Sequence, residues 1–534
     1  MTNALTFVSG AAVGSAEVSK YPWLDYFVPM LVIVLLIALV YIIWSYQKGL
    51  KGHPREIYLM FFTKVTEYSA YGGINLAFVL YLSHDMGLSD IQAGTFMGVY
   101  AIGLSCLAMI VGPVCDTIGI KKTLLVGAYT LLFSRILMPF MPNLILATLF
   151  GFLPMALGIA ITGPVISVSI KRFTTPATAT LGFGMFYTLM NVGWAVGAWM
   201  FDTVRRAFGE TAEIAIPIVN TSISTYQFII LIGFFINIPD LIAILLMRDG
   251  AEMTEEGVRI NPLAKLGDGG NFITGIISTV KNTAIKTGTQ IKNVFGERAF
   301  WVFIFMLFTT VFVRLTFEHF HLTFPKYGIR IFGEGVPIGS VYGVLNPVLV
   351  VFLVPLVAAM TTKVSSYKMM LIGTFISASS VFLAVMPHSW FEPMVDTWFG
   401  ELIFVRWLDL PVESRSALFF PLIFFIFIFT IGEALWSPRF MQFTAQIAPK
   451  GKEGSYISLA ILPWIFARAL GGPLSGWLLE MYSPMGLPSG VEHYPRHFMI
   501  WVWVGSIAIV SPILLFVLKK LFMKAEAGSV EKVA

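Results

Sequence analysis

Charged residues are scarce in this chain of 534 residues, since 35 Lys and Arg with 30 Asp and Glu make up 12% of it. That is about half the share found in an average soluble domain. Apolar residues make up 57%, more than a water-soluble fold could hide from solvent. The composition excludes a soluble globular enzyme, and a net charge of +5 gives nucleic-acid binding no support.

Cysteine is nearly absent as well. Cys106 and Cys115 lie nine residues apart on one predicted helix, about 13 Å along its axis, which is too far for a disulfide. The sequence contains no metal-type Cys/His spacing, no nucleophile and base pattern and no phosphate-binding loop. We therefore expect no cofactor, no metal and no enzymatic activity.

Long apolar runs are what the chain has in excess. Thirteen segments separated by Gly, Pro and charged residues are long enough to cross a bilayer. They lie at about 27–45, 57–83, 90–115, 121–141, 143–169, 181–204, 226–247, 299–323, 336–361, 368–387, 417–447, 455–480 and 497–523. We interpret the first as a retained anchor helix, because no compact basic segment precedes it and no small-residue cleavage site follows. The sequence predicts an all-α, multi-pass protein of the lipid bilayer.

The other twelve segments divide six and six around a polar stretch, an organisation typical of major-facilitator transporters. The predicted parts are an N-terminus with an extra anchor helix (1–50), a six-helix bundle (51–247), a cytoplasmic linker (248–298) and a second six-helix bundle (299–534). Within the linker, Ile and Val recur at near-helical spacing over 273–291. That pattern fits a surface-lying amphipathic helix and an ordinary solvated linker about equally well.

Lys and Arg are distributed unevenly between the two sets of loops. Twenty-two would lie on the side that holds the linker and the C-terminus, and eight on the other. By the positive-inside rule the first side is cytoplasmic and the N-terminus lies outside; the short tails favour a bacterial inner membrane. The outer loop 388–416 is rich in Trp and Phe. We interpret it as an interfacial helix, with a substrate lid as the alternative.

Several ionisable side chains fall inside the predicted spans, where each should face a partner or a wet cavity because of the cost of burying charge in lipid. They are Lys64, Arg135, Arg314, Arg439, Arg468, Glu67, Asp240, Glu318 and Glu433. The default interpretation is a transport pathway. We assign Arg135 and Asp240 structural roles, because they lie near helix ends or lack an evident partner.

Glu67 follows Lys64 by three residues and shares its helix face. The two side chains either form a local ion pair or belong to a site where Glu67 exchanges protons as its pairing and burial change. Arg314 and Glu318 are spaced by four residues on another helix. The two histidines just after Glu318 could titrate near neutral pH, although we interpret them as structural groups near a helix end; they are His319 and His321.

Glu433 stands little more than one turn before Pro438. A proline in a spanning helix frees backbone groups and allows a bend, so Glu433 could move with a gate. The alternative is a structural pair with a cation such as Arg439 or Arg468.

Residues 112–122 read Gly-Pro-Val-Cys-Asp-Thr-Ile-Gly-Ile-Lys-Lys. They resemble the major-facilitator signature G-x-x-x-D-[RK]-x-G-[RK]-[RK], with Thr117 and Ile120 at two of its basic positions. In such a turn, glycine lets the acid, here Asp116, approach a helix N-terminus or a cation and latch one transporter conformation.

Three further segments resemble the proton-dependent oligopeptide transporter family. Residues 186–193 are similar to its F-Y-x-x-[IM]-N-x-G signature and residues 432–438 to its G-E-x-x-x-S-P, while residues 67–89 follow the order of E-R-F-x-Y-Y-G…L-Y-L…G-L-S. The resemblance is scattered over most of 57–480. It implies a major-facilitator fold, with the extra N-terminal helix added to it, and alternating access about a central cavity.

The resemblance further implies a small organic, peptide-like substrate and protons as partners. We expect Glu67 and Glu433 to couple protons and Lys64, Asp116 and Pro438 to act in gating. The residues expected to bind substrate are Tyr68, Tyr71, Tyr187, Asn191, Arg314 and Glu318.

Two departures from the family pattern keep alternatives open. The family's E-x-x-E-R reads Lys-Val-Thr-Glu-Tyr over 64–68, and Gly163-Pro164 stands where peptide-carrying members have Lys-Pro. The first alternative is a carrier of a non-peptide solute that works as an exporter or uniporter. The second is a membrane sensor or assembly subunit without transport, to which the extra helix and the outer loop would point.

Overall fold

The computed structural model describes residues 20–175, 177–261, 298–361, 364–447, 462–486 and 494–530. Within these ranges, helices occupy all thirteen segments that the sequence predicts to cross the membrane. The helix considered for the linker, over 273–291, lies outside the described residues. Contact clustering divides the chain into an N-terminal unit, which includes residues 20–45 and 387–418, and a core unit, which includes 46–386 and 419–530.

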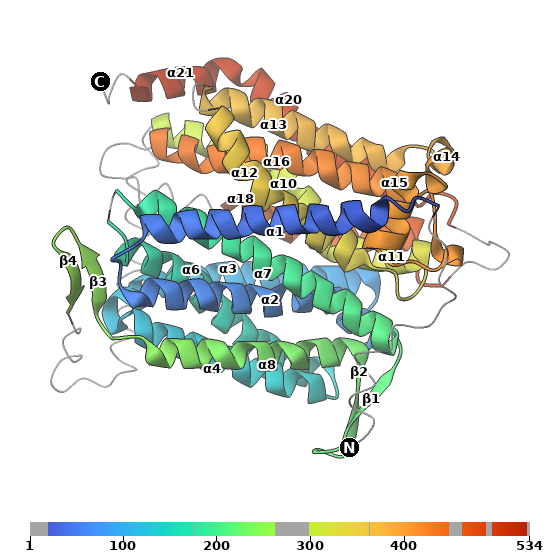
Figure 1. Cartoon of the computed structure of the whole chain (residues 1–534), viewed down its shortest axis with the longest axis horizontal. Helices are drawn as coiled ribbons and strands as arrows, with labels where there is room; N and C mark the ends of the chain where they lie inside the picture. Colours follow the sequence, from blue (N-terminus) through green and yellow to red (C-terminus); the bar gives the residue numbers. More distant parts are fainter. Residues whose placement is uncertain are drawn as a thin grey trace. The chain divides into compact units, whose positions relative to one another are not determined.

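The first half of the core unit contains six long helical stretches and two strand pairs (Figure 1). Its elements are α2 (Arg55–His84), α3 (Asp90–Ile118), α4 (Ile120–Leu137), η2 (Met138–Phe140), α5 (Leu144–Leu146), η3 (Ala147–Phe152), α6 (Leu153–Arg172), α7 (Ala179–Phe208), β1 (Glu213–Ile216), β2 (Thr221–Ser224), α8 (Thr225–Leu246), β3 (Ala251–Thr254) and β4 (Gly257–Ile260).

The second half of the core unit is built in the same way from six helical stretches and a short connecting helix. Its elements are α10 (Arg298–Leu322), α11 (Phe324–Phe332), η4 (Gly339–Val344), α12 (Leu345–Met360), α13 (Ser366–Ser380), η5 (Val381–Val385), α16 (Phe419–Ile447), α18 (Leu462–Tyr482), α19 (Met499–Ala508), α20 (Val510–Val517) and α21 (Lys519–Val530).

Local sequence signals explain several helix boundaries. Ser89 before α3 and Ser224 before α8 each form a capping box with the glutamine three residues later, which satisfies free N–H groups at the helix start. Gly119 separates α3 from α4 at a φ of 91°, a conformation that favours glycine.

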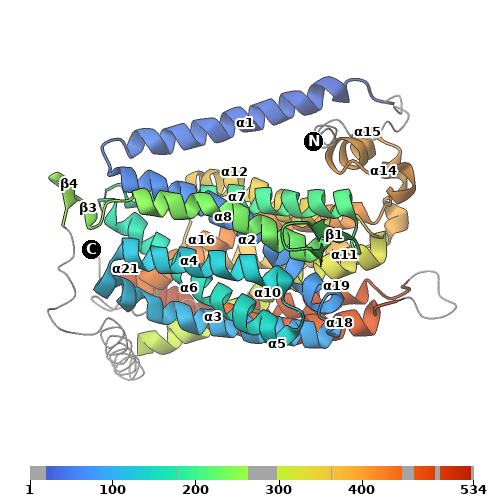
Figure 2. The same ribbon diagram turned by 90° about the horizontal axis from the view of Figure 1, so that it is seen from below.

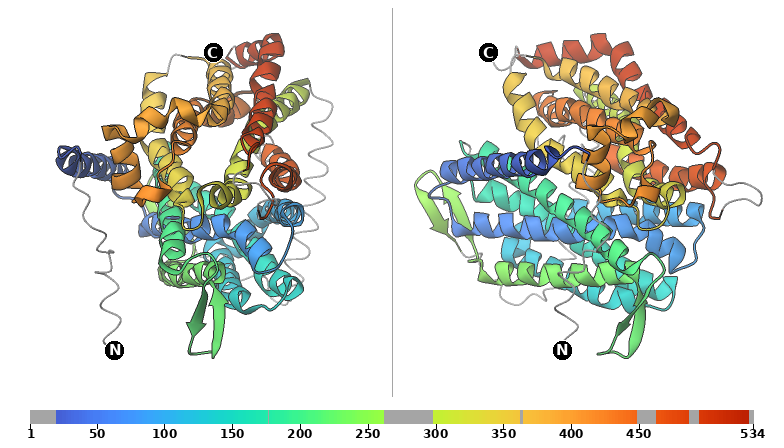
Figure 3. Two further views of the ribbon diagram at one scale, coloured as in Figure 1. Left: turned by 90° about the vertical axis from the view of Figure 1, so that its right-hand side faces the viewer. Right: turned by 45° about the vertical axis from the view of Figure 1, so that its right-hand side comes forward.

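Two antiparallel hairpins, which the sequence did not predict, flank α8 (Figure 3). In β1–β2, Glu213 pairs with Ser224, and in β3–β4, Ala251 pairs with Ile260. Asn220 takes the left-handed conformation in the first turn, with a φ of 49°. These strands are four residues long and alternate too briefly to give a period-two signal in the sequence.

Ten helical stretches of the described residues are long and apolar enough to cross a membrane. The three predicted spans outside that set are α2, α7 and α18, which have 30, 30 and 21 residues and therefore have the length to cross. These helices are more polar because, as shown below, they carry much of the polar lining of the central cavity.

The two halves of the core unit meet through α3 against α18 and through α7 against η4 and α12. The backbones approach closely at glycines: a Cβ added to Gly472 would lie 2.2 Å from the carbonyl oxygen of Gly94. Only glycine at position 472 permits this approach of α3 and α18.

In the N-terminal unit, α1 (Leu24–Gly49) is one long helix (Figure 2). The rest of the unit forms short turns instead of the single helix that the sequence favoured; they are η6 (His388–Trp390), α14 (Glu392–Val395), α15 (Trp398–Glu401), η7 (Leu402–Trp407) and η8 (Val412–Ser414). Prolines precede or begin three of these turns. Because proline interrupts a helix, the segment does not form one long helix. Within the unit, Arg406 bonds Asp25 at 2.6 Å, and the Trp23 and Trp398 rings lie 5.7 Å apart.

A partly buried ion pair joins the start of α2 to the segment just after α8. Arg248 donates to Glu56 from its side-chain Nε and Nη2 atoms at 2.7 and 2.8 Å and from its backbone N–H at 3.1 Å. Burial alone would raise the pKa of Glu56, but the hydrogen bonds and charge of Arg248 outweigh it and lower the pKa to about 2.

The low pKa of Glu56 predicts an acid-dependent contribution to stability. Because the unfolded chain holds this proton more tightly, the stabilisation is complete above the ordinary pKa of 4.5 and is lost as the pH falls through about 2. We expect the melting temperature of Arg248→Gln to lie below that of the wild type at neutral pH and to converge with it over that window. Arg259→Gln, which removes an exposed pair at 3.9 Å, should track the wild type at every pH. Parallel profiles for the wild type and Arg248→Gln would contradict the assignment.

Candidate functional site

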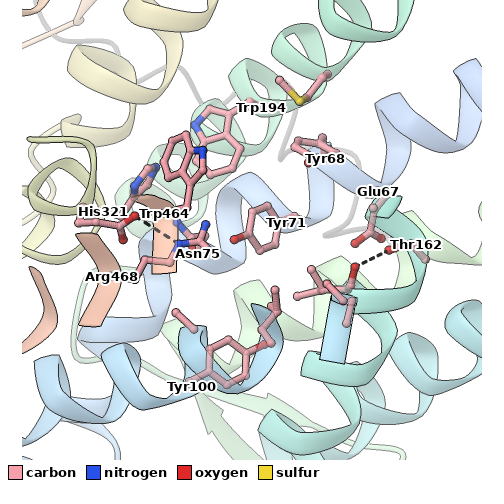
Figure 4. A pocket seen from close by; sticks show the side chains of 18 of the residues that line it. Glu67, Tyr68, Tyr71, Asn75, Tyr100, Thr162, Trp194, His321, Trp464 and Arg468 are labelled. Carbon is pink, nitrogen blue, oxygen red and sulfur yellow. Dashed lines mark hydrogen bonds and ion pairs between the residues drawn. The ribbon is translucent and has the colours of Figure 1, made fainter. Parts of the chain in front are cut away.

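A cavity of about 440 Å³ lies between the two halves of the core unit. This volume is within the range of small-molecule pockets. Its polar and aromatic lining comes from α2, α3, α6 and α7 of the first half and from α10, η4, α12 and α18 of the second; Figure 4 shows ten of these residues by name.

Aromatic rings form one wall of this central cavity. Tyr71 and Trp194 lie 5.4 Å apart between ring centroids, Tyr68 lies 5.9 Å from Tyr71, and Trp194 lies 5.2 Å from His321 of the second half. Edge-on contacts of this kind hold rings in fixed orientations. The wall therefore joins the halves and offers faces for an apolar or cationic group.

An ion pair joins α10 to α18 inside the cavity. Arg468 Nε donates to Glu318 Oε1 at 3.3 Å, and both residues line the cavity. The Arg468 side chain remains 27% exposed and lies over the Trp464 ring, with the guanidinium carbon 5.8 Å from its centroid. In the view of Figure 4, Tyr71 lies between Glu67 on one side and Arg468 on the other. A solute in the cavity would meet both signs of charge at this pair.

Glu433 lies behind the cavity wall. It accepts a hydrogen bond of 2.8 Å from Nδ2 of Asn346, which lines the cavity and also donates to Thr430. Arg314 is buried among rings, with its guanidinium carbon 4.4 Å from the Trp464 centroid and 4.7 Å from that of Phe440. The sequence-based alternative that Glu433 pairs with Arg439 or Arg468 is wrong, since Glu433 bonds the amide of Asn346 while the two arginines bond other groups.

Glu67 belongs to a buried cluster that spans three helices of the first half. Arg135 of α4 donates to both of its carboxylate oxygens at 3.2 Å. Asn237 of α8 donates to Glu67 at 2.8 Å and also to Asp240, which in turn accepts from Thr66. Glu67 therefore pairs with Arg135 and not, as the local alternative had it, with Lys64. Arg135 and Asp240, which we assigned structural roles partly because no partner was evident in the sequence, both have buried partners.

The structure brings part of the predicted site together in the central cavity. Tyr68, Tyr71, Asn191, Glu318 and Glu67 line it. Of the predicted substrate and proton residues, Tyr187, Arg314 and Glu433 are not among its lining residues, and neither are Lys64 and Pro438.

The predicted gating residues lie in different settings. The Lys64 amine is buried over the rings of Tyr68 and Phe186, at 3.8 and 3.9 Å from their centroids. Pro438 is exposed within α16, and the side chain of Asp116 lies outside the described part of the chain.

Sequence reasoning missed several cavity residues. Arg468 was counted among the ionisable side chains inside the spans and as a possible partner of Glu433, but it was not placed among the substrate-binding residues. His321 was interpreted as structural, and Asn75, Trp194 and Asn346 were not considered. A signal was available for two of them: Asn75 and Trp194 continue the cavity face of α2 and α7 at one-turn intervals from Tyr71 and Asn191.

Charged groups seal one end of the core unit, which we call the Asp90 end. Asp90 of α3 bonds Lys326 of α11 at 2.8 Å and Arg330 at 2.7 Å. Toward the C-terminal end of α7, Asp202 accepts from the backbone of Gly339 at 2.9 Å and from that of Ser340. Each of these contacts joins the two halves.

A second buried group at the Asp90 end involves Glu210, in the loop after α7. Glu210 accepts from Arg205, from Tyr226 at 2.6 Å and from the backbone of Gly335 at 3.1 Å. Burial would raise the pKa of Glu210, but these bonds and the Arg205 charge lower it. At the opposite end, contacts such as Lys121 to the Met247 carbonyl stay within one half.

Comparisons with known proteins agree with this architecture. The family model of the Major Facilitator Superfamily matches residues 60–406. Dipeptide and tripeptide permease B of Yersinia enterocolitica is 27% identical over 173 residues, which cover 31% of this chain and 34% of the permease. The permease B of Photorhabdus asymbiotica is 28% identical over 167 residues, covering 30% and 34%. The chain thus spans about a third of the length of the curated relatives it matches.

Solved structures extend the similarity over most of the chain. A POT family transporter in complex with 5-aminolevulinic acid superposes with a TM-score of 0.64 at 17% identity, covering 88% of this chain and 97% of that one. The peptide transporter POT in complex with sulfate gives a TM-score of 0.62 at 15% identity, covering 89% and 96%. At these identities the likeness establishes a shared fold.

Proposed function

Because the chain belongs to the Major Facilitator Superfamily, we propose that it is a secondary transporter that moves a small organic solute through the central cavity by alternating access. The observation that carries the proposal is the Glu318 and Arg468 pair in a cavity shared by both halves. With the N-terminus outside, as the positive-inside rule predicts, the contacts between the halves at the Asp90 end would close the cavity toward the outside.

A solute with both an amine and a carboxylate suits this cavity. Glu318 would receive the amine, Arg468 the carboxylate, and the rings of Tyr71 and Trp194 the apolar part. The curated relatives are named as dipeptide and tripeptide permeases, which supports a dipeptide-like substrate.

Proton coupling would use Glu433, whose partner Asn346 reaches the cavity wall. A proton on Glu433 would remove a buried charge that faces Arg314, and the rings around Arg314 connect α10, α16 and α18. Glu67, bound by Arg135 on both oxygens, would respond less readily.

A carrier of a non-peptide solute is the second candidate. Gly163 and Pro164 line the cavity, so the place where peptide-carrying members have a lysine is neutral here. This favours a solute that needs no cation at that wall.

The proposal predicts uptake driven by a pH gradient. In proteoliposomes made acidic outside, we expect a labelled dipeptide or a related amino-acid derivative to accumulate above its external concentration, because protons entering with it release the energy of their gradient. A protonophore should abolish that accumulation. Uptake indifferent to the imposed gradient would remove the coupling, and competition among unlabelled solutes would separate the two candidate substrates.

A further inference from the structure

A second, much smaller cavity lies inside the first half of the core unit, enclosed by α2, α4, α6 and α8. Its volume is about 10 Å³, close to that of a single water-sized sphere. Its polar lining consists of Thr63, Glu67, Thr162, Asn237 and Asp240. We call it the Thr63 cavity.

Two buried oxygens on the wall of the Thr63 cavity have no hydrogen-bond partner among the described residues. They are Oγ1 of Thr63 and Oδ1 of Asn237, on side chains that are 1% and 2% exposed. The orientation of the Asn237 amide is fixed, because its Nδ2 donates to the carboxylates of Glu67 and Asp240. Unsatisfied buried oxygens are costly and rare, so this pair indicates that a ligand completes the site.

Charge at the Thr63 cavity is unbalanced. Two carboxylates, Glu67 and Asp240, are buried there, and each is 4% exposed. A single guanidinium, Arg135, reaches them, and it is committed to both oxygens of Glu67. Among the described residues, Asp240 accepts hydrogen bonds only from the neutral side chains of Thr66 and Asn237, and burying an ionised carboxylate without a cationic partner is unfavourable.

We propose that the Thr63 cavity binds one sodium ion, with oxygens of Thr63, Glu67, Asn237 and Asp240 as its ligands. The donor set is all oxygen, as hard cations prefer. A monovalent rather than a divalent ion matches the one carboxylate, Asp240, whose hydrogen-bond partners are both neutral, and the volume suits one desolvated ion.

The site adjoins the transport path. Glu67 and Thr162 line both the Thr63 cavity and the central cavity. A cation held by Asp240 and Glu67 therefore sets the charge on the central cavity wall. This inference goes beyond the proposed function, because binding of the ion at rest needs neither a substrate nor a proton gradient.

Equilibrium binding of radioactive sodium to the purified full-length protein tests the assignment, with choline replacing sodium at constant ionic strength. We expect saturable binding of one ion per chain, together with a melting temperature that rises in sodium and not in choline, since a ligand of the folded chain stabilises it. Asp240→Asn should abolish both effects.

Two threonine variants keep the test decisive if Asp240→Asn fails to fold. Thr63→Val removes an oxygen that has no protein partner and should weaken sodium binding about tenfold, the change expected for one lost neutral contact. Thr123→Val is the matched control. The hydroxyl of Thr123 is buried and donates to the Gly119 carbonyl at 2.7 Å, and Thr123 is not among the residues that line the Thr63 cavity. The Thr123→Val variant should bind sodium as the wild type does.

Absence of saturable sodium binding would overturn the proposal and leave the two carboxylates to share a proton. Equal affinities of Thr63→Val and Thr123→Val would overturn it too. Failure of the transport proposal gives a different pattern, in which sodium still binds but no solute is taken up.

Discussion

Replacing Arg468 with glutamine is expected to reduce substrate uptake by about 10- to 100-fold, the range that corresponds to one lost charge-assisted hydrogen bond. Arg468 is the cation of the ion pair that lines the cavity, and 27% of its side chain is exposed to the cavity space. Its loss removes the partner of a substrate carboxylate and leaves Glu318 buried beside an amide. Initial rates of labelled-solute uptake in proteoliposomes measure the effect.

Arg439→Gln provides the matched control for Arg468→Gln. Arg439 lies on α16 in the same half, but it bonds Gln442 at 2.6 Å and the carbonyl and hydroxyl of Thr361 at 3.0 and 2.9 Å, and it is not among the cavity-lining residues. We expect its uptake to stay within about twofold of the wild type, since substitutions away from a binding site change little. If both arginine variants lose uptake equally, the cavity pair has no special role.

Helices could be predicted because an apolar run is a local property of the sequence. The span α1, for example, follows directly from the uninterrupted apolar stretch over 26–44. The hairpin β1–β2 could not, because four-residue strands leave too short a pattern, although Pro217 and Asn220 mark its turn.

Ion pairs across helices could not be predicted for a related reason. Spacing of three or four residues suggested that Lys64 would meet Glu67 and that Arg314 would meet Glu318. The structure instead pairs Glu67 with Arg135, 68 residues away, and Glu318 with Arg468, 150 residues away. Spacing along one helix says which side chains share a face but not which neighbouring helix that face meets.

The contacts at the Asp90 end that join the two halves predict that transport requires this end to open. Asp90 and Lys326 lie in different halves and are joined at 2.8 Å. In alternating access these groups must separate each time the cavity opens to that side. A covalent link between the two positions should therefore stop transport, down to the background of empty vesicles.

The most direct measurement of alternating access is uptake before and after that link is formed. The variant carries Asp90→Cys and Lys326→Cys, with the native Cys106 and Cys115 replaced by alanine, and a reducible bifunctional thiol reagent joins the new pair. The account predicts that uptake falls to background when the link forms, returns when it is reduced, and is unaffected by the reagent in either single-cysteine variant. Undiminished uptake by fully linked protein would contradict it.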